Sequence, residues 1–355
     1  MRILVIGGGV IGSVYAARLH RAGQQVTILA RGTRLHEIRE HGLVLEEQPG
    51  GHRIVARVPV AAGLDAQDAY DLVLVAVRRN HLDGVLPALA RNRNTPNVLF
   101  LANNASGPGL LTDALGTERV LLGFPGTGGT LRAGIVRHGV VRGRLGPTTI
   151  GELDGRTTNR LLSVAAVWRQ AGLPVTICHN MDAWLKTHVA LISPIANALY
   201  MVGGDNYRLA HTRDGVVLMV RAMREGLRVL TAHGVAITPR AVRAIEWVPE
   251  PILVALLQRV LDTPLAALVA AGHANAARDE MQELADEFQV LVRSTAVPTP
   301  AIDCLYTYLD STVSPIAEGR AQIPLQWRSL WIAIGAVGAV ALVGQHLWRR
   351  RRRRT

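Results

Sequence analysis

Short apolar runs and helical stretches alternate along the N-terminal part of the chain. Residues 2–6 (RILVI) and 25–30 (QVTILA) have the continuous apolar character of buried parallel strands. Residues 13–22, between these runs, have a helical pattern that stops at Gly23. This order predicts a strand–helix–strand unit.

The same alternation continues downstream. Apolar runs at 71–77 and 97–103 predict two more buried strands, and helical patterns at about 80–90 and 107–115 separate them. Such a series is typical of a Rossmann-like, doubly wound α/β sheet.

Two segments predict antiparallel pairing instead. Residues 43–60 alternate around Pro49-Gly50-Gly51, which indicates a hairpin, and residues 135–151 have the pattern of antiparallel strands that close the domain. From about residue 159 helical patterns dominate, and they continue to about residue 311.

We therefore expect three parts in the chain. A Rossmann domain covers residues 1–170, and an all-helical substrate domain covers residues 171–313. Residues 314–355 form a linker, an apolar helix and a poly-arginine tail.

The turn after the first strand has the sequence GGGVIG (7–12), which fits the G-x-G-x-x-G pattern. In this pattern Gly7 permits a tight turn, Gly9 lets the backbone approach a pyrophosphate, and Gly12 lets the helix pack on the strand. Val10 and Ile11 lie at the helix N-terminus, where unpaired N–H groups attract an anion. A strand before the motif and a helix after it predict a dinucleotide site, and the alternative is a glycine turn without a ligand.

The end of the second strand indicates which dinucleotide. An NAD site has an acidic residue there for the ribose hydroxyls, whereas this chain has Arg31, with Arg34 close behind. Arginine can pair with a 2′-phosphate, so the sequence predicts NADP. The alternative for Arg31 is a solvated loop charge.

Composition limits the classes of function. The 355 residues are enough for two domains, and Cys178 and Cys304 belong to no CxxC motif, which favours a reducing compartment over a disulfide scaffold. The net charge is +12, and removing the six charges of Arg349–Arg354 leaves +6. With 4% aromatic residues and no nucleic-acid motif, we expect no nucleic-acid partner. No signal-peptide pattern precedes the first strand, so we expect a cytoplasmic protein.

No metal site is expected. The segment HEIREH (36–41) resembles a zinc motif, but its histidines are five residues apart. On a helix this spacing separates the two side chains by about 140°, so they would not share a metal ion.

Several segments, in this order, resemble the ketopantoate reductase (2-dehydropantoate 2-reductase) family over most of residues 1–312. They are GGGVIG (7–12), Arg31, VAVRRNHL (75–82), LANNASG (101–107), AGLPVTICHNMDAWLK (171–186) and AVPTPAID (296–303). The resemblance implies that NADPH delivers hydride to the carbonyl of a small 2-oxo acid. It also implies cofactor contacts for Arg31 and for Arg78, which replaces the family's usual lysine.

The resemblance assigns roles around the reacting carbonyl. Lys186, one helical turn after Asp182, matches a lysine whose ammonium can stabilise the developing alkoxide and donate a proton. Lysine is scarce in this chain, which favours that role over an ordinary surface lysine. Glu280 matches a glutamate that either orients the substrate or pairs with Lys186, and Asn103 matches an asparagine that contacts both cofactor and substrate. The alternatives are a helix-surface charge for Glu280 and a strand-end turn for Asn103.

Other family positions differ in this chain. Ala190 and Pro194 lie where the family usually has asparagines, and Ser193 is a partial substitute for substrate contact. Asn206 is a further candidate for substrate contact, at a longer spacing than the family has.

The polar stretch that the family has before its glutamate is replaced here by AALVAAGHANAARDE (266–280), in which His273 and Asn275 are the obvious polar groups. Two hypotheses follow. The first is an NADPH-dependent reductase of ketopantoate or a related 2-oxo acid, favoured by Lys186, Glu280 and Asn103. The second is a catalytically silent NADP(H)-binding sensor or membrane-tethered interaction protein, favoured by Ala190 and by the altered stretch.

The tail has a pattern of its own. Residues 330–348 are mostly apolar, Trp327, Trp331 and Trp348 flank the apolar run, and Arg349–Arg354 follow. A helix from Trp327 to Trp348 would span about 30 Å, close to the thickness of a bilayer core. This predicts membrane association, as a C-terminal anchor or as an interfacial helix held by anionic lipid. The alternatives are a helix that packs in a homodimer and a disordered tail.

Overall fold

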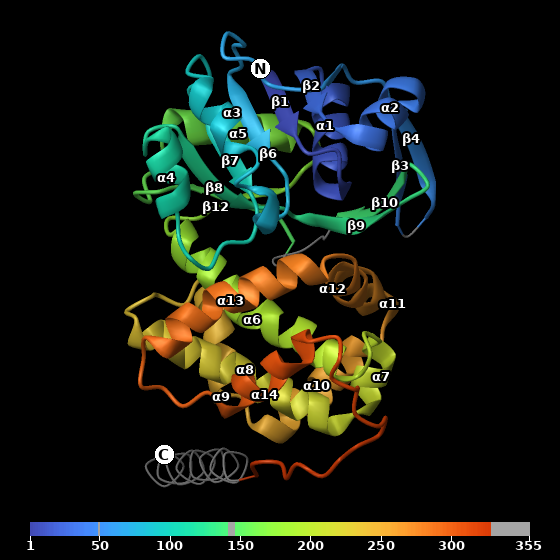
Figure 1. Ribbon diagram of the computed structural model, residues 1–355, viewed down its shortest axis with the longest axis vertical. Coiled ribbons are helices and arrows are strands. Elements are labelled where there is room, and N and C mark those ends of the chain that lie inside the picture. Colours follow the sequence, from blue (N-terminus) through green and yellow to red (C-terminus); the bar gives the residue numbers. More distant parts are fainter. Residues whose placement is uncertain (49, 141–145, 328–355) are drawn as a thin grey trace, which may run out of the picture.

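The computed structural model describes residues 1–48, 50–140 and 146–327, which form two domains joined end to end (Figure 1). The first domain contains the predicted doubly wound sheet. Its described strands, in spatial order, are β12 (Val175–Ile177), β11 (Thr148–Glu152), β8 (Val120–Phe124), β7 (Val98–Leu101), β6 (Leu72–Val75), β1 (Arg2–Ile6), β2 (Gln25–Leu29) and β5 (Val60–Ala61). Neighbouring strands are parallel except β8 and β11, which are antiparallel.

A second, smaller sheet contains part of the segments expected to be antiparallel. Its described strands, in spatial order, are β4 (His52–Ala56), β3 (Leu43–Glu47), β10 (Ile135–Val140) and β9 (Thr127–Arg132). In this sheet β10 pairs with β3 in parallel. The hairpin predicted at 43–60 is present as β3 and β4. The segment 135–151 divides between the sheets, because β10 pairs with β3 and β9 whereas β11 pairs with β8. Alternation shows that a strand is half-buried, but its partners lie far away in the sequence.

Helices cover the large sheet. Those of the first domain are α1 (Val10–Arg21), α2 (Gly32–His41), α3 (Leu86–Arg91), α4 (Gly109–Leu115) and α5 (Asn159–Gln170). The helix predicted at 13–22 therefore begins earlier, within the glycine motif. The helix predicted at about 80–90 is a 3₁₀ turn at Arg79–His81 followed by α3.

The first domain extends past the boundary expected after residue 170. β12 pairs in parallel with β11 and so adds a strand to the large sheet up to Ile177. The short strand was recognisable in the sequence, but its membership of this sheet depends on a contact with β11.

The second domain is helical, as expected. Its helices are α6 (Met181–Met201), α7 (Asn206–His211), α8 (Arg213–Ala232), α9 (Ala244–Trp247), α10 (Glu250–Leu261), α11 (Pro264–Ala266), α12 (Gly272–Ala276), α13 (Arg278–Arg293) and α14 (Pro300–Tyr306). A π-helical turn at Ala267–Ala271 links α11 to α12.

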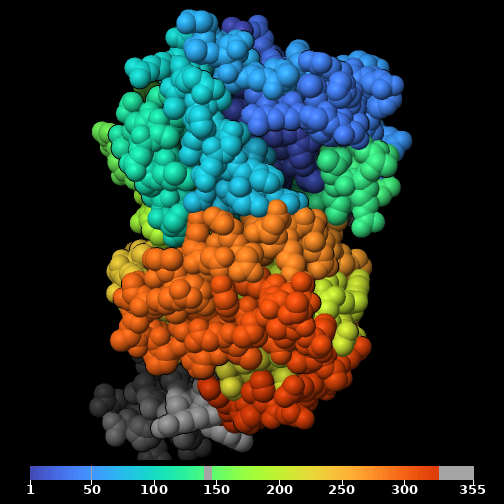
Figure 2. All heavy atoms as spheres, viewed as in Figure 1, coloured from blue at the N-terminus to red at the C-terminus, as the bar shows by residue number. Residues whose placement is uncertain are grey.

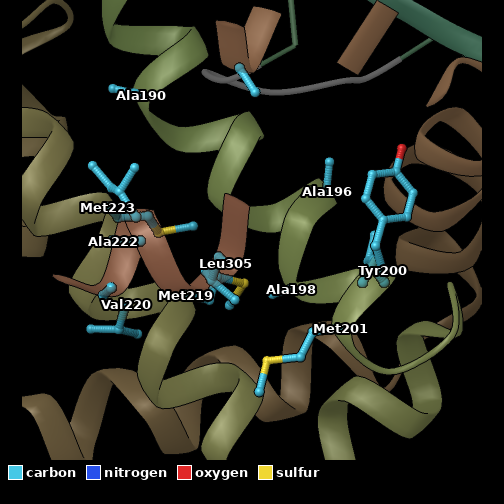
Figure 3. Packing of buried hydrophobic residues seen from close by; sticks show 14 of the residues in the cluster. Ala190, Ala196, Ala198, Tyr200, Met201, Met219, Val220, Ala222, Met223 and Leu305 are labelled. Atoms are coloured by element: carbon cyan, nitrogen blue, oxygen red, sulfur yellow. The ribbon is translucent and has the colours of Figure 1, made fainter. Parts of the chain in front are cut away.

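Helix α6 connects the two cores. At its N-terminal end Met181 and Leu185 pack into the core on one face of the large sheet. Its C-terminal part packs against α8 and α14 in the core of the helical domain, where Figure 3 shows Ala198, Met219 and Leu305 close together. Residues on α6 between these parts therefore lie at the boundary between the domains.

Residues 313–327, the strap, continue along the helical domain without regular secondary structure. The backbone N–H groups of residues 322 and 323 donate to the carboxylate of Asp214, and that of Gln326 donates to Glu250. The strap is thus fixed to the end of the helical domain that lies away from the first domain (Figure 1).

The membrane prediction falls outside the described residues, since the apolar segment 330–348 and Arg349–Arg354 follow them. Within residues 1–327, leaving out the undescribed positions, no single helix has the length and apolar composition of a membrane span. Only α10 taken together with residues 264–276 passes that test, and this pair bends by 76°.

Candidate active site

The glycine motif forms a turn that is open on one side. Gly7 has a φ of +119°, and a Cβ there would lie 2.4 Å from the carbonyl oxygen of Ala76. A Cβ at Gly12 would lie 1.8 Å from the carbonyl oxygen of Gly7. At Gly9, the residue before α1, a Cβ would meet no atom within 4 Å. Gly7 and Gly12 are therefore required by the fold, while Gly9 and the N-terminus of α1, with Val10, leave room for a phosphate group.

The two arginines after β2 have different surroundings. Arg34 donates from Nε to the carbonyl oxygen of Gly8 at 2.9 Å and from Nη2 to Ser13 at 3.3 Å, so its side chain stabilises the glycine turn. Arg31 is exposed before α2 and has no ion pair among the described residues. Of the two, only Arg31 therefore stays a candidate for contact with a phosphate group.

Arginines after β6 join the first domain to α13. Arg78 donates from Nη1 to Asp279 at 3.1 Å and from Nη2 to the carbonyl oxygen of Ala276 at 2.6 Å. Arg79 is largely buried and pairs with Glu287 at 2.6 Å. The cofactor contact expected of Arg78 stays a prediction, because this side chain bridges the domains here. The Arg79–Glu287 pair was not anticipated, since nothing in the local sequence of either residue indicates the other.

Two of the candidate residues, Asn103 and Glu280, are in contact at the boundary between the domains. Asn103 follows β7 and donates from Nδ2 to Glu280 Oε1 at 3.2 Å. The backbone N–H of Arg79 donates to the same oxygen at 3.3 Å. Both side chains are buried, and Oδ1 of Asn103 has no hydrogen-bond partner among the described residues. An unpaired buried amide oxygen is costly, so a donor from outside the protein is expected there.

Lys186 lies on α6 near the same strand end. Its Nζ donates to Asp182 at 2.6 Å, and only 15% of the side chain is exposed. A Cβ at Gly107, in the loop that follows Asn103, would lie 3.5 Å from this Nζ. Of the two roles considered for Glu280, pairing with Lys186 is not seen here, because each forms its own contacts.

Two further candidates lie apart from this group. The Nδ2 of Asn206 donates to the carbonyl oxygens of Leu261 and Thr263, which close the end of α10. Ser193 is buried, and its Oγ, which has no hydrogen-bond partner in the described part of the chain, lines a cavity between α6, α8, α13 and α14 with room for about one water molecule. The substrate contacts expected of Asn206 and Ser193 stay predictions, and the structure gives Asn206 a capping role. Within the described ranges no group of His, Cys, Asp and Glu side chains could hold a metal ion.

Aromatic side chains that the sequence did not single out line the boundary beside this group. The ring of His188 on α6 lies 4.1 Å from that of Phe124 at the end of β8, between centroids, and is stacked on Trp184 at 5.2 Å. His273 on α12 has its Nε2 4.0 Å from Glu280 Oε2. Figure 2 shows the surface hollowed where dark-blue N-terminal residues lie above the orange helices of the second domain.

The comparisons with known proteins agree with this geometry. A family model described as ketopantoate reductase PanE/ApbA matches residues 3–155. The 2-dehydropantoate 2-reductase of Halobacterium salinarum is 32% identical over 247 residues, which cover 68% of this chain and 79% of the relative. That of Archaeoglobus fulgidus is 29% identical over 66% of this chain and 75% of the relative.

Solved structures show the same fold. A ketopantoate reductase from Ralstonia eutropha is 23% identical, with a TM-score of 0.71, over 87% of this chain and 97% of its own. A D-mandelate dehydrogenase solved with NADH and anilino(oxo)acetate is 16% identical, with a TM-score of 0.70, over 88% and 97%. With the match to the relative from Halobacterium salinarum, these findings show that the chain belongs to the ketopantoate reductase family of oxidoreductases.

Proposed function

We propose that this oxidoreductase reduces a small 2-oxo acid to the 2-hydroxy acid, with NADPH as hydride donor. The observation that carries the proposal is the meeting of Asn103 and Glu280, from different domains, beside the loop that also contacts Lys186. These are the three side chains that the resemblance placed around the reacting carbonyl. The names of the relatives, 2-dehydropantoate 2-reductases, support a substrate of this class.

The cofactor side of the proposal rests on the first domain. The space at Gly9 and the N–H groups at the start of α1 fit a pyrophosphate, and exposed Arg31 fits a 2′-phosphate. No acid occupies the end of β2, where an NAD site would have one. When bound, the nicotinamide would supply the hydride that reaches the carbonyl carbon.

Lys186 would supply the proton. As hydride reaches the carbonyl carbon, negative charge develops on the carbonyl oxygen, and an ammonium group stabilises that charge and protonates the oxygen. Asp182 holds the Nζ in place beside Gly107. Glu280 can accept a hydrogen bond from a substrate hydroxyl, and Oδ1 of Asn103 can accept one from the bound cofactor or substrate.

The composition of the chain supports this role for Lys186. It is the single lysine among 39 basic residues, and all the others are arginine. Arginine does not release a proton under physiological conditions, whereas lysine can when its surroundings lower the pKa. A lysine kept at this one position therefore fits a proton donor better than a structural cation.

The test is NADPH oxidation, followed by absorbance, with ketopantoate and a panel of other 2-oxo acids. We expect Lys186→Ala to lower kcat by about 10²- to 10⁴-fold, the usual contribution of acid–base catalysis. Lys186→Arg is the matched control, because it keeps a cation beside Asp182 but cannot donate a proton, so it should remain nearly as slow. Full turnover by Lys186→Ala would contradict the role. NADPH binding without turnover of any acid would favour the silent sensor.

The choice of NADPH has its own test. Arg31→Ala should raise the KM for NADPH by at least about tenfold, because a charge-assisted contact is lost, while the KM for NADH changes little. Arg39→Ala, at an exposed arginine on helix α2, which follows Arg31, is the control and should alter neither value. An equal effect of Arg31→Ala on both cofactors would show that this arginine does not read the 2′-phosphate.

A further inference from the structure

A cleft in the first domain lies apart from the candidate active site. It has a volume of about 480 Å³ and opens between the C-terminal ends of α1 and α5 and the small sheet, whose strands β3, β4 and β10 lie beside α1 (Figure 1). A volume of this size is in the range of pockets that bind small molecules. The titratable residues that line it are Arg18, Arg21, Glu47, His52 and His138.

Helix α1 separates this cleft from the proposed cofactor site. The glycine turn is at the N-terminal end of the helix, whereas Arg18 and Arg21 belong to its last turn. A helix of 12 residues is about 18 Å long. A ligand in the cleft would therefore occupy a different place from a phosphate group at Gly9.

Arg18 is a mostly buried arginine whose hydrogen-bond donors are unused. Only 20% of its side chain is exposed, and its Nη2 lies 3.5 Å from Glu47 Oε1. Its guanidinium donates no hydrogen bond within the part of the chain that the structure describes, and its Nε is shielded from solvent. A Cβ at Gly172, which also lines the cleft, would lie 3.7 Å from Nη1. Both Nη groups therefore lie beside residues of the cleft, with N–H donors available to an acceptor.

His138, on β10, lines the same cleft and is 1% exposed. Its Nδ1 has no hydrogen-bond partner among residues 1–48, 50–140 and 146–327. Burial, with Arg18 adding to the shift and Glu47 opposing it, lowers the pKa of His138, so the ring is neutral at physiological pH. Two neighbouring side chains thus have buried nitrogen atoms without partners, which is costly unless a ligand or ion completes the site.

Basic residues in the last turn of a helix commonly offset the negative end of the helix dipole. Arg21, which is exposed, fits this explanation, as does exposed Arg91 in the last turn of α3. Arg18 does not fit it, because a cation that only offsets a dipole loses solvation when it is buried without hydrogen bonds. An anion between Arg18 and Arg21 would account for both the burial and the unused donors.

We propose that this cleft binds a small metabolite through its phosphoryl group, which Arg18 and Arg21 hold. A phosphoryl group has three outer oxygens, which can accept from both guanidinium groups and from the imidazole of His138, whereas a carboxylate has two. Two arginines against Glu47 leave a positive charge in the cleft, which favours an anion. Ile54 adds apolar lining for the rest of the metabolite. Binding in this cleft does not depend on which acid the enzyme reduces.

The test is isothermal titration calorimetry of the full chain with inorganic phosphate, against chloride at the same ionic strength. We expect a phosphate site whose Kd rises at least about tenfold in Arg18→Gln, the scale of a lost charge-assisted hydrogen bond. Arg21→Gln, at an exposed position, should raise the Kd less, by about threefold. Arg91→Gln, at the end of α3, and Arg31→Ala, in the proposed cofactor site, are the controls and should leave this Kd unchanged.

Three results would overturn the inference. An unchanged Kd in folded Arg18→Gln and Arg21→Gln, or no binding beyond that of chloride, would show that the cleft holds no phosphate. Loss of binding in Arg31→Ala alone would assign the phosphate to the cofactor site instead. Displacement of phosphate by equimolar acetate would show that the cleft does not select a phosphoryl group. Thermal unfolding verifies that each variant is folded, and Arg21→Gln decides the question if Arg18→Gln is not.

Discussion

The helical domain buries carboxylates at both of its ends, and the two ends pair them differently. At the strap end, Glu250 is 0% exposed and accepts hydrogen bonds from Arg221 at 2.9 and 3.0 Å and from the N–H of Gln326 at 3.0 Å. Asp214 is 1% exposed and accepts from the N–H groups of residues 322 and 323. Glu250 thus accepts from a charged arginine and a backbone N–H, and Asp214 accepts from two consecutive backbone N–H groups.

At the end of the helical domain that faces the first domain, Glu280 is nearly as deeply buried as Glu250, at 4% exposed, but it accepts weaker hydrogen bonds. Its two donors, Asn103 Nδ2 and the N–H of Arg79, are at 3.2 and 3.3 Å, and no arginine or lysine forms an ion pair with it among the described residues. The Oδ1 of Asn103 beside it accepts no hydrogen bond from any residue that the structure describes.

Burial alone therefore does not distinguish a structural acid from a functional one. A buried carboxylate with all its acceptor sites used holds neighbouring segments together, as Glu250 does for α8, α10 and the strap. One with capacity left over can accept a hydrogen bond from a ligand. We therefore expect substitutions at the two ends to change the free energy of unfolding by different amounts.

The largest expected effect is that of Glu250→Gln. Removing this charge leaves Arg221 and Arg224 close together without their counter-ion, so we expect the free energy of unfolding to fall by about 3 kcal/mol. Chemical denaturation measures it, with Glu246→Gln on the adjoining helix α9 as the control. A loss below about 1 kcal/mol would contradict a structural role for Glu250.

A smaller loss of stability is expected when the pH is lowered. Burial by itself would raise the pKa of Glu250, but hydrogen bonds from Arg221 and Gln326 and the nearby arginine charges outweigh it, so the pKa lies below its ordinary 4.5. Its stabilising contribution is complete above 4.5 and is lost as the pH falls through the lowered pKa. Wild-type stability should therefore fall more steeply than that of Glu250→Gln below pH 4.5, and parallel curves would count against the ion pair.

The smallest change in stability is expected for Glu280→Gln. Because its pairing is weak and an amide can accept from the same donors, we expect a change within about 1 kcal/mol, while turnover of the 2-oxo acid falls at least about tenfold. Glu283→Gln, an exposed acid on the same helix, is the control for both measurements. Destabilisation as large as that of Glu250→Gln would remove the difference between the two ends.

Much of the fold and part of the site could be predicted from the sequence. The glycine motif, the central strands and the helical second domain follow from local patterns. Asn103 and Glu280 were selected through the resemblance to the family, and the structure brings them together, while their roles stay predictions. Arg34 was grouped with Arg31 as a phosphate contact, because the sequence cannot show that its side chain turns back to Gly8.

The sequence by itself determined where strands and helices form, that a glycine turn opens a phosphate-sized space, and that one lysine is present. These features depend on backbone preferences and apolar periodicity over a few neighbouring residues. Only the tertiary structure decided which strands share a sheet and which arginines bond to the protein itself. It also decided which buried carboxylate can still accept a hydrogen bond from a ligand. Pairs such as Arg79 with Glu287 join residues about 200 positions apart, and their geometry is set by how the two domains pack.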